Sequence, residues 1–90
     1  MTQDMENTII SIAKKYQAKR VFLFGSMLET PETARDIDLG VEGVLGVAFF
    51  RMMGDLVRGL PKPVDVIDMD VTNSFTMLVK RDGKVVYEQP

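Results

Sequence analysis

Hydrophobic residues in the first third of the chain follow a helical spacing and then a short strand-like run. From about Thr2 to Gln17, apolar residues recur every three or four positions and predict an amphipathic helix: Met5, Ile9, Ile12, Ala13 and Tyr16. The run Arg20–Phe24 is too short for a helix and stops at Gly25, which predicts a buried strand. Ser26 can then cap a second helix of about one turn, because Pro31 disfavours helix at the residue before it.

A regular alternation of side chains follows from Asp36 to Glu42. Alternate positions fall on opposite faces, with Asp36, Asp38 and Gly40 on one and Ile37, Leu39 and Val41 on the other. This pattern predicts a strand with one acidic face and one dry face, which ends at Gly43.

The segment from Val44 to Leu60 predicts the longest helix, and it carries two apolar stripes. The first stripe is Leu45, Phe49, Met52, Leu56 and Leu60, and the second is Val47, Phe50 and Val57. A helix that is apolar over so much of its circumference is either deeply buried or shared with a partner. Both interpretations stay open: a wide core face, or a protein–protein contact, which includes a homodimer through residues 44–60.

The last third of the chain predicts a strand, a short helix and a final strand. Val64–Ile67 forms the strand, and Asp70–Asn73 offers a start for a helix that contains Phe75, Leu78 and Val79. Arg81–Lys84 is a turn signal before the strand Val85–Tyr87. The alternation of helices and strands predicts an α/β (α+β) fold, with a small mixed sheet of about four strands covered by helices in a single domain, residues 1–90.

Composition narrows the chemistry that this chain can perform. It has no cysteine and no histidine, so a bound metal has to be held by oxygen, which favours magnesium, calcium or manganese. A net charge of −2 with interspersed acids and bases argues against nucleic-acid binding. The basic cluster Lys14, Lys15, Lys19 and Arg20 fits the last turn of the first helix. Without a membrane-length apolar stretch or a signal-peptide pattern, we expect a cytoplasmic protein.

Asp36 and Asp38 are the first candidates for chemistry. Alternate residues of a strand lie about 6.6–7 Å apart on one face, so both carboxylates can reach a single point. Two like charges there repel each other unless a cation lies between them. Mg²⁺ binds one or two carboxylates together with substrate phosphates, and phosphoryl or nucleotidyl transfer needs mainly this positioning and charge neutralisation.

Gly25 and Ser26, separated from Asp36 by nine residues, supply a second half-site. Glycine lets the backbone approach a phosphate, a helix start presents free N–H groups, and the serine hydroxyl can add a hydrogen bond. Asp65 adds a third carboxylate from another strand, as a metal ligand or as a base for an attacking hydroxyl. Asp68 is its rival, but it falls on the opposite face of that strand. Together, the turn at Gly25 and Ser26 and the carboxylates of Asp36, Asp38 and Asp65 indicate chemistry on a nucleoside triphosphate.

The segment Phe24-Gly25-Ser26, the nine-residue gap and Asp36-Ile37-Asp38-Leu39 resemble the signature of the DNA polymerase beta-like nucleotidyltransferases. The chain length, the strand around Asp65 and the closing segment 83–88 resemble the minimal nucleotidyltransferases in particular. The resemblance implies the nucleotidyltransferase fold and a magnesium-dependent transfer of a nucleoside monophosphate from an NTP such as ATP, with Mn²⁺ as a substitute metal. It also implies that Asp36, Asp38 and Asp65 are catalytic metal ligands and that Gly25 and Ser26 bind the nucleotide.

Minimal members of this family are often paired with a HEPN-domain protein, as the antitoxin that adenylylates its toxin. The resemblance therefore implies a small helical protein as partner. This chain departs from the family pattern after Gly-Ser, where an arginine is common and Met27 and then Glu29 stand instead. Arg35 also stands where serine is common before the first aspartate. These departures motivate an alternative, a catalytically weak or inactive domain that neutralises a partner, or associates with itself, through helix 44–60.

Overall fold

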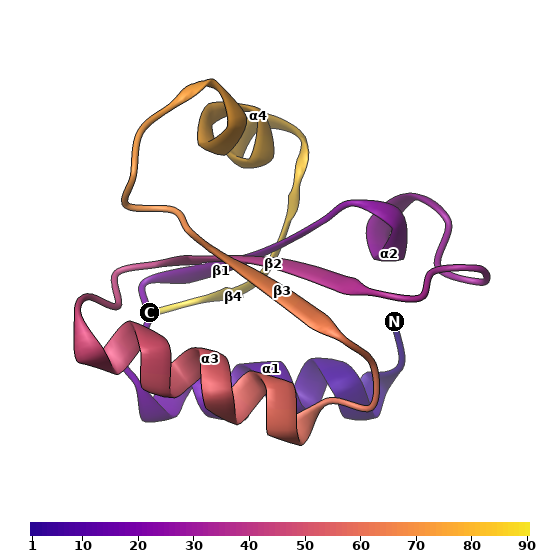
Figure 1. The fold of residues 1–90 in the computed structure, drawn as a ribbon, viewed down its shortest axis with the longest axis horizontal. Helices are drawn as coiled ribbons and strands as arrows, with labels where there is room; N and C mark the ends of the chain where they lie inside the picture. Colours follow the sequence, from indigo (N-terminus) through magenta and orange to yellow (C-terminus); the bar gives the residue numbers. More distant parts are fainter.

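The computed structural model describes residues 1–90. Its helices and strands alternate along the chain (Figure 1). The elements are α1 (Gln3–Lys15), β1 (Arg20–Phe24), α2 (Ser26–Glu29), β2 (Ile37–Glu42), α3 (Val47–Gly59), β3 (Val64–Asp68), α4 (Ser74–Asp82) and β4 (Lys84–Glu88). The strands form one sheet in the order β3-β2-β1-β4. β1 is antiparallel to β2 and β4, whereas β2 and β3 are parallel. The predicted mixed sheet of four strands is therefore confirmed.

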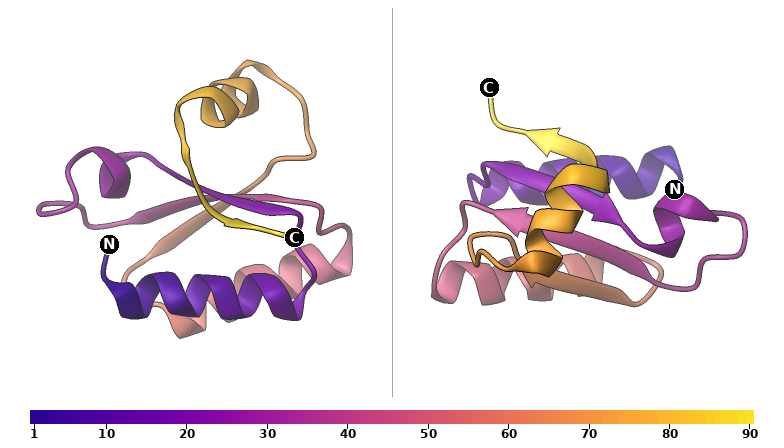
Figure 2. Two further views of the ribbon diagram at one scale, coloured as in Figure 1. Left: turned by 180° about the vertical axis from the view of Figure 1, so that it is seen from behind. Right: turned by 90° about the horizontal axis from the view of Figure 1, so that it is seen from above.

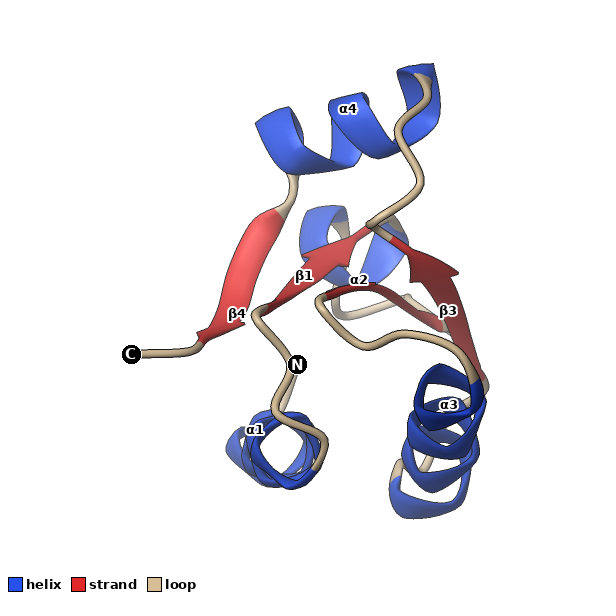
Figure 3. Cartoon of the chain, turned by 90° about the vertical axis from the view of Figure 1, so that its left-hand side faces the viewer, coloured by secondary structure: helices blue, strands red, loops and turns tan.

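Helices cover both faces of this sheet. α1 and α3 lie next to each other under one face, and α4 lies on the other (Figures 1 and 3). In the view from above, α4 crosses the sheet while α2 stands at its end (Figure 2). The end of the sheet near α2 is where β1 finishes and β2 begins, so the two predicted half-sites meet there. None of the helices has the length and apolar composition that a membrane crossing requires.

The main core fills the space between the sheet and the pair α1–α3. Its fully buried members come from the dry side of the strands and the inward stripes of the helices: Ile9, Ala13, Val21, Ile37, Leu39, Val41, Met52 and Leu56. A smaller cluster under α4 joins Phe22, Met69 and Val79. The alternation in β2 thus has the predicted effect, because its apolar positions all face the larger core.

The start of α3 differs from the prediction. Gly46 stands at the N-cap with a φ of 60°, so Val44 and Leu45 precede the helix. Leu45 is 70% exposed, and its assignment to the core stripe is wrong, although the rest of that stripe is buried. The second stripe, Val47, Phe50 and Val57, is exposed. The wide-core interpretation of this helix is therefore wrong for the chain on its own.

Two other element boundaries also differ. Ser26 is the first residue of α2, and Gly25 occupies the N-cap position without a side-chain hydrogen bond, so the expected serine cap is wrong. Arg81 and Asp82 complete α4, which shortens the expected turn at 81–84 to Gly83. A hydrogen-bonded capping box fixes where α4 begins, since Asn73 and Thr76 bond each other's backbone N–H groups.

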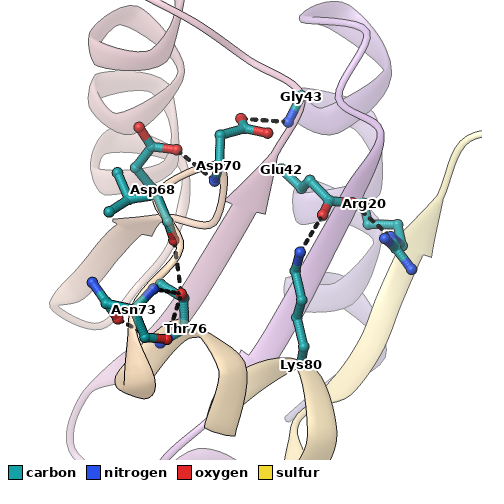
Figure 4. Close-up of polar contacts among 9 residues, drawn as sticks. Arg20, Glu42, Gly43, Asp68, Asp70, Asn73, Thr76 and Lys80 are labelled. Atoms are coloured by element: carbon teal, nitrogen blue, oxygen red, sulfur yellow. Dashed lines mark hydrogen bonds and ion pairs between the residues drawn. The ribbon is translucent and has the colours of Figure 1, made fainter.

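Arg20 begins β1, as the strand prediction for Arg20–Phe24 has it, and does not lie in the last turn of the first helix, where the basic cluster had placed it. Its Nε lies 2.7 Å from Oε1 of Glu42, and Nζ of Lys80 lies 3.1 Å from Oε2, so one carboxylate joins β1, β2 and α4 (Figure 4). Glu42 is only 5% exposed. Burial alone would raise the pKa of Glu42, but hydrogen bonds from Arg20 and Lys80 outweigh burial and hold that pKa below its usual value.

Replacing Glu42 by glutamine is expected to lower the free energy of unfolding at neutral pH by about 1–3 kcal/mol, because two cations lose their carboxylate. The pKa of Glu42 is lower in the folded chain than in the unfolded one. Its stabilisation is therefore complete above the unfolded value of 4.5 and is lost as the pH falls through the folded value. Urea unfolding should show a smaller difference between the two proteins near pH 3 than near pH 7. Glu32→Gln, at an exposed residue without an ion pair, is the control. An equal difference at both pH values would contradict the ion-pair account.

Candidate active site

Strand register brings Asp38 and Asp65 together at one end of the sheet. Asp38 in β2 is the direct partner of Asp65 in β3 and of Phe24 in β1. Paired residues of neighbouring strands point to the same face, so the three side chains share one face. The ring of Phe24 meets Phe75 of α4, which identifies this face as the one that α4 covers. The two carboxylates therefore lie next to each other on that face.

Asp36 lies in the loop just before β2, where its side chain is exposed to solvent. Its predicted place as the first strand residue is wrong by one position, but its charge still reaches Asp38. Burial, and then the nearby charges of Asp65 and Asp36, raise the pKa of Asp38 above its usual value. A half-buried carboxylate beside two like charges is an environment in which a divalent cation removes electrostatic repulsion.

Gly25 links the phosphate-binding turn to these carboxylates. Its φ is 73° and its ψ is −155°, a conformation that side-chain-bearing residues rarely adopt. A β-carbon built on Gly25 would also collide with Oδ2 of Asp38. The backbone of the turn therefore lies directly against the Asp38 side chain. Ser26 follows as the exposed first residue of α2, so its hydroxyl faces solvent beside this contact.

The donor set fits a divalent cation that prefers oxygen. The chain has neither histidine nor cysteine, so carboxylates are the strongest ligands that it offers. No three acidic side chains converge on one point in this structure. Magnesium does not require such convergence before substrate binds, because it commonly takes one or two carboxylates and completes its shell with water and phosphate oxygens.

Asp68 is engaged elsewhere. Its partner in β2 is Val41, which faces the larger core, so Asp68 lies on the opposite face from Asp65. Its Oδ1 accepts the backbone N–H of Asp70, and Asp70 in turn accepts the N–H of Gly43 (Figure 4). Asp68 therefore braces the loop after β3, and Asp65 is the carboxylate of this strand that accompanies Asp38.

The residues that replace the family's arginine have structural tasks. Met27 is 3% exposed and belongs to the main core, and Leu28 packs against that core. A long cation at either position would be buried. Glu29 is exposed at the end of α2 and makes no ion pair, and Arg35 is likewise exposed and unpaired. The turn therefore has no cation of its own, and Arg35 is the first one after it in the sequence.

Aromatic side chains next to the site were not anticipated. Phe24 and Phe75 meet edge to face, with ring centroids 5.7 Å apart and an interplanar angle of 78°. We assigned Phe75 and Leu78 to a short helix and Phe24 to the core, but Phe75 is 49% exposed and Leu78 45% exposed. The spacing of Phe75, Leu78 and Val79 correctly indicates a helix. It does not show that, of these three residues, only Val79 is buried.

Comparisons with known proteins give the family and the fold of this chain. The family model "Polymerase beta, Nucleotidyltransferase" matches residues 7–90. The chain resembles the crystal structure of the toxin–antitoxin MntA–HepT with a TM-score of 0.71 at 21% identity, covering 98% of this chain and 74% of that one. A toxin–antitoxin structure with AMP-PNP gives a TM-score of 0.73 at 22% identity, over 93% and 73% of the two chains. The complex of a tri-AMPylated Shewanella oneidensis HEPN toxin with its MNT antitoxin gives 0.72 at 22% identity, over 99% and 74%.

No curated protein matches the chain. The solved structures are too distant in sequence to show more than the fold, and that fold is the nucleotidyltransferase fold of antitoxins from HEPN–MNT pairs. The family match is independent of them and spans nearly all of the sequence, including the Gly-Ser turn and all three carboxylates. The chain therefore belongs to the polymerase beta family of nucleotidyltransferases.

Proposed function

We propose that this chain transfers a nucleoside monophosphate from a nucleoside triphosphate, by preference ATP, to a hydroxyl group of a partner protein, with magnesium as the metal. The observation that carries the proposal is the junction of the two half-sites. Gly25 lies so close to Asp38 that no β-carbon fits between them, and Asp38 is paired with Asp65 across the strands. A triphosphate held at Gly25 and Ser26 would therefore lie beside the carboxylates.

Asp36 and Asp38 would hold Mg²⁺, or Mn²⁺ in its place, with Asp65 as the third ligand. When bound, the metal neutralises phosphate charge and stabilises the leaving pyrophosphate. The acceptor oxygen forms a bond to the α-phosphorus, and the bond from that phosphorus to the oxygen bridging to the β-phosphate breaks, so pyrophosphate leaves with the electron pair. Asp65 is exposed and adjacent to Asp38, and we assign it the proton of the acceptor hydroxyl.

A small helical protein is the acceptor that the comparisons favour. The Shewanella oneidensis complex contains a tri-AMPylated HEPN toxin with an MNT antitoxin, and the other two structures compared above are of toxin–antitoxin proteins. We propose by analogy that this chain is a cytoplasmic antitoxin that modifies a HEPN-domain partner.

Incubating the chain with ATP labelled at the α-phosphate, a magnesium salt and a HEPN-domain protein tests the transfer. We expect label bound covalently to the HEPN protein and one pyrophosphate released for each label transferred. Removing the metal with EDTA should abolish both, and adding Mn²⁺ should restore them. Pyrophosphate release without labelled protein, or transfer that survives EDTA, would refute this mechanism.

The exposed face of α3 favours a second function, docking of the partner. Val47, Phe50 and Val57 are 66%, 69% and 52% exposed. Together with Gly54 they recur at alternating spacings of three and four residues, which is the spacing by which one helix packs against another. Gly54 lies in the middle of this α3 face, with the guanidinium of Arg58 folded over it.

Charge on α3 indicates what kind of helix fits there. The single acid of α3, Asp55, already accepts hydrogen bonds from Lys15, Tyr16 and Arg58. Arg51 adds a cation without an ion-pair partner beside this face, and Asp55 balances the charge of only one of the two cations, Lys15 and Arg58, that bond to it. A partner helix with acidic residues along its edge complements this surface, whereas an antiparallel second copy would bring arginines together.

Phe50→Asp is expected to weaken binding of a HEPN-domain partner by roughly 30-fold or more, the loss typical of an exposed aromatic anchor. Magnesium and ATP binding should not change, because α3 lies on the face of the sheet opposite α4 (Figure 3), whereas Asp38 and Asp65 lie on the α4 face. Calorimetry with each ligand measures both effects. Met77→Asp is the matched control, since Met77 is 61% exposed on α4. Unchanged partner binding, or a native mass of two chains that Phe50→Asp reduces to one, would contradict the heterologous docking role.

A further inference from the structure

A groove between α2 and α4 opens directly beside the candidate active site. Its volume is about 130 Å³, and it is lined by Phe24, Gly25, Leu28, Glu29, Phe75, Leu78, Val79, Asp82 and Gly83. Gly25 belongs both to this groove and to the contact with Asp38. We propose that the groove binds the base of the nucleotide and that Glu29 makes it select bases that carry an exocyclic amino group. The inference rests on the proposed nucleotidyl transfer.

The walls of the groove suit a flat aromatic ligand. Phe75 of α4 presents its ring edge to face with Phe24, and about half of its surface remains accessible. Leu78, one helical turn further along α4, is also about half exposed, and Leu28 faces it from α2. Exposed aromatic rings beside a phosphate site provide a surface on which a base can stack, and apolar neighbours exclude water from that contact.

The polar groups of the groove are acceptors. Arg81 holds the carboxylate of Asp82 with two hydrogen bonds, from Nε to Oδ1 and from Nη2 to Oδ2, each 2.9 Å long. Glu29 has no ion-pair partner and is exposed, so its carboxylate is available to a ligand. An ionised carboxylate only accepts hydrogen bonds. It therefore attracts the exocyclic amino group of adenine or cytosine and repels the carbonyl oxygen that hypoxanthine or uracil carries in place of that group.

This assignment also gives a role to the departure of Glu29 from the family pattern. A cation after the Gly-Ser turn would bind phosphate, but the chain has a core residue at 27, a partly buried leucine at 28 and an acid at 29. The acid lines the aromatic groove, where it can contact the base. The α2 segment would then contribute base selection in place of an additional phosphate contact.

Calorimetric titration of the full chain with ATP, ITP and inorganic tripolyphosphate in the presence of magnesium tests the proposal. The native chain should bind ATP about tenfold more tightly than ITP, since one hydrogen bond to a charged group is replaced by a repulsion. Phe75→Ala should weaken ATP binding by roughly 5- to 100-fold and leave tripolyphosphate binding unchanged. Glu29→Gln should remove most of the difference between ATP and ITP. Met77→Ala, on the same helix outside the groove, should change nothing.

The outcomes separate this inference from the proposed function. If tripolyphosphate binds but Phe75→Ala leaves the affinity for ATP unchanged, the base assignment is wrong and the nucleotidyltransferase proposal stands. Equal weakening of ATP and tripolyphosphate would also overturn the base assignment, because Phe75 would then act on the whole site. If neither ATP nor tripolyphosphate binds the native chain, both proposals fail. Should Phe75→Ala not fold, Phe75→Leu retains bulk without an aromatic face and serves the same comparison.

Discussion

Asp38→Asn is expected to reduce nucleotidyl transfer by roughly a thousandfold or more, equivalent to about 4 kcal/mol of lost transition-state stabilisation. Asp38 is the residue on which the candidate site converges. It is paired with Asp65, lies within the electrostatic range of Asp36, and touches the turn at Gly25. Asparagine keeps the shape of the side chain but removes the charge that would bind the cation. Label transfer from α-labelled ATP to the partner protein measures the loss.

The same substitution is expected to leave the fold at least as stable as the native one. Burial and the charges of Asp65 and Asp36 raise the pKa of Asp38, so the folded chain holds this proton more tightly than the unfolded chain. Stability therefore falls as the pH rises through the interval between the unfolded and the folded pKa, and the full cost is present at neutral pH. Removing the charge removes that cost. Thermal unfolding near neutral pH should give a midpoint for Asp38→Asn that is equal to or higher than the native one.

Asp68→Asn is the matched control for this experiment. Asp68 lies on the opposite face of the sheet and hydrogen-bonds within its own loop, so its variant should retain transfer activity. Loss of activity in both variants would point to general damage of the sheet. If Asp38→Asn still neutralised a HEPN-domain toxin while Phe50→Asp did not, the chain would be a binding module without catalysis.

Most of the fold could be predicted from the sequence because its signals are local. The alternation in residues 37–42 and the three- and four-residue spacing in α1 each report one apolar face, and those faces meet in the main core. Errors occur where a tertiary contact or a glycine decides the boundary. Gly46 starts α3 later than the apolar spacing suggests, and Leu45 is left in solvent. The strand Arg20–Phe24 was predicted with its observed bounds, whereas the ion pair of Arg20 with Glu42 on the neighbouring strand has no local signal.

The residues of the candidate site could be named from the sequence, but their arrangement could not. Strand parity indicated that only one of Asp65 and Asp68 can join the cluster, the position of Asp65 within the apolar run favoured it, and the parallel register pairs Asp65 with Asp38. The direct contact between Gly25 and Asp38 depends on how β1 and β2 are aligned, which is a property of the assembled sheet. The groove between α2 and α4 likewise combines segments about 50 residues apart in the sequence. Neither feature has a signature in a single stretch of residues.

Gly25→Ala is expected to abolish most of the activity and to destabilise the fold, for two separable reasons. The first is backbone strain, because a φ of 73° with a ψ of −155° costs a residue with a β-carbon about 1–3 kcal/mol. The second is the collision of the new methyl group with the carboxylate of Asp38. Displacing that carboxylate by about 1 Å can lower the rate by roughly a hundredfold.

Gly46 provides a control that isolates the first reason. It occupies the N-cap of α3 with a φ of 60° and a ψ of −136°, close to the conformation of Gly25, but a β-carbon there would meet no atom within 4 Å. Gly46→Ala should therefore destabilise the chain by about 1–3 kcal/mol without changing nucleotide binding or transfer. Urea unfolding of Gly46→Ala measures the free-energy cost of the backbone strain alone. Urea unfolding of Gly25→Ala measures the cost of the strain and the collision together.

A double-mutant cycle with Asp38→Ala then measures the collision directly. Truncating Asp38 removes the atom that the new methyl group meets, so Gly25→Ala should cost less in the Asp38→Ala background than in the native one. In that background its cost should fall to that of Gly46→Ala, because only the backbone term remains. Strictly additive effects of the two substitutions would show that Gly25 and Asp38 do not touch in solution. The proposed junction of the phosphate-binding turn with the metal-binding carboxylates would then lose its physical basis.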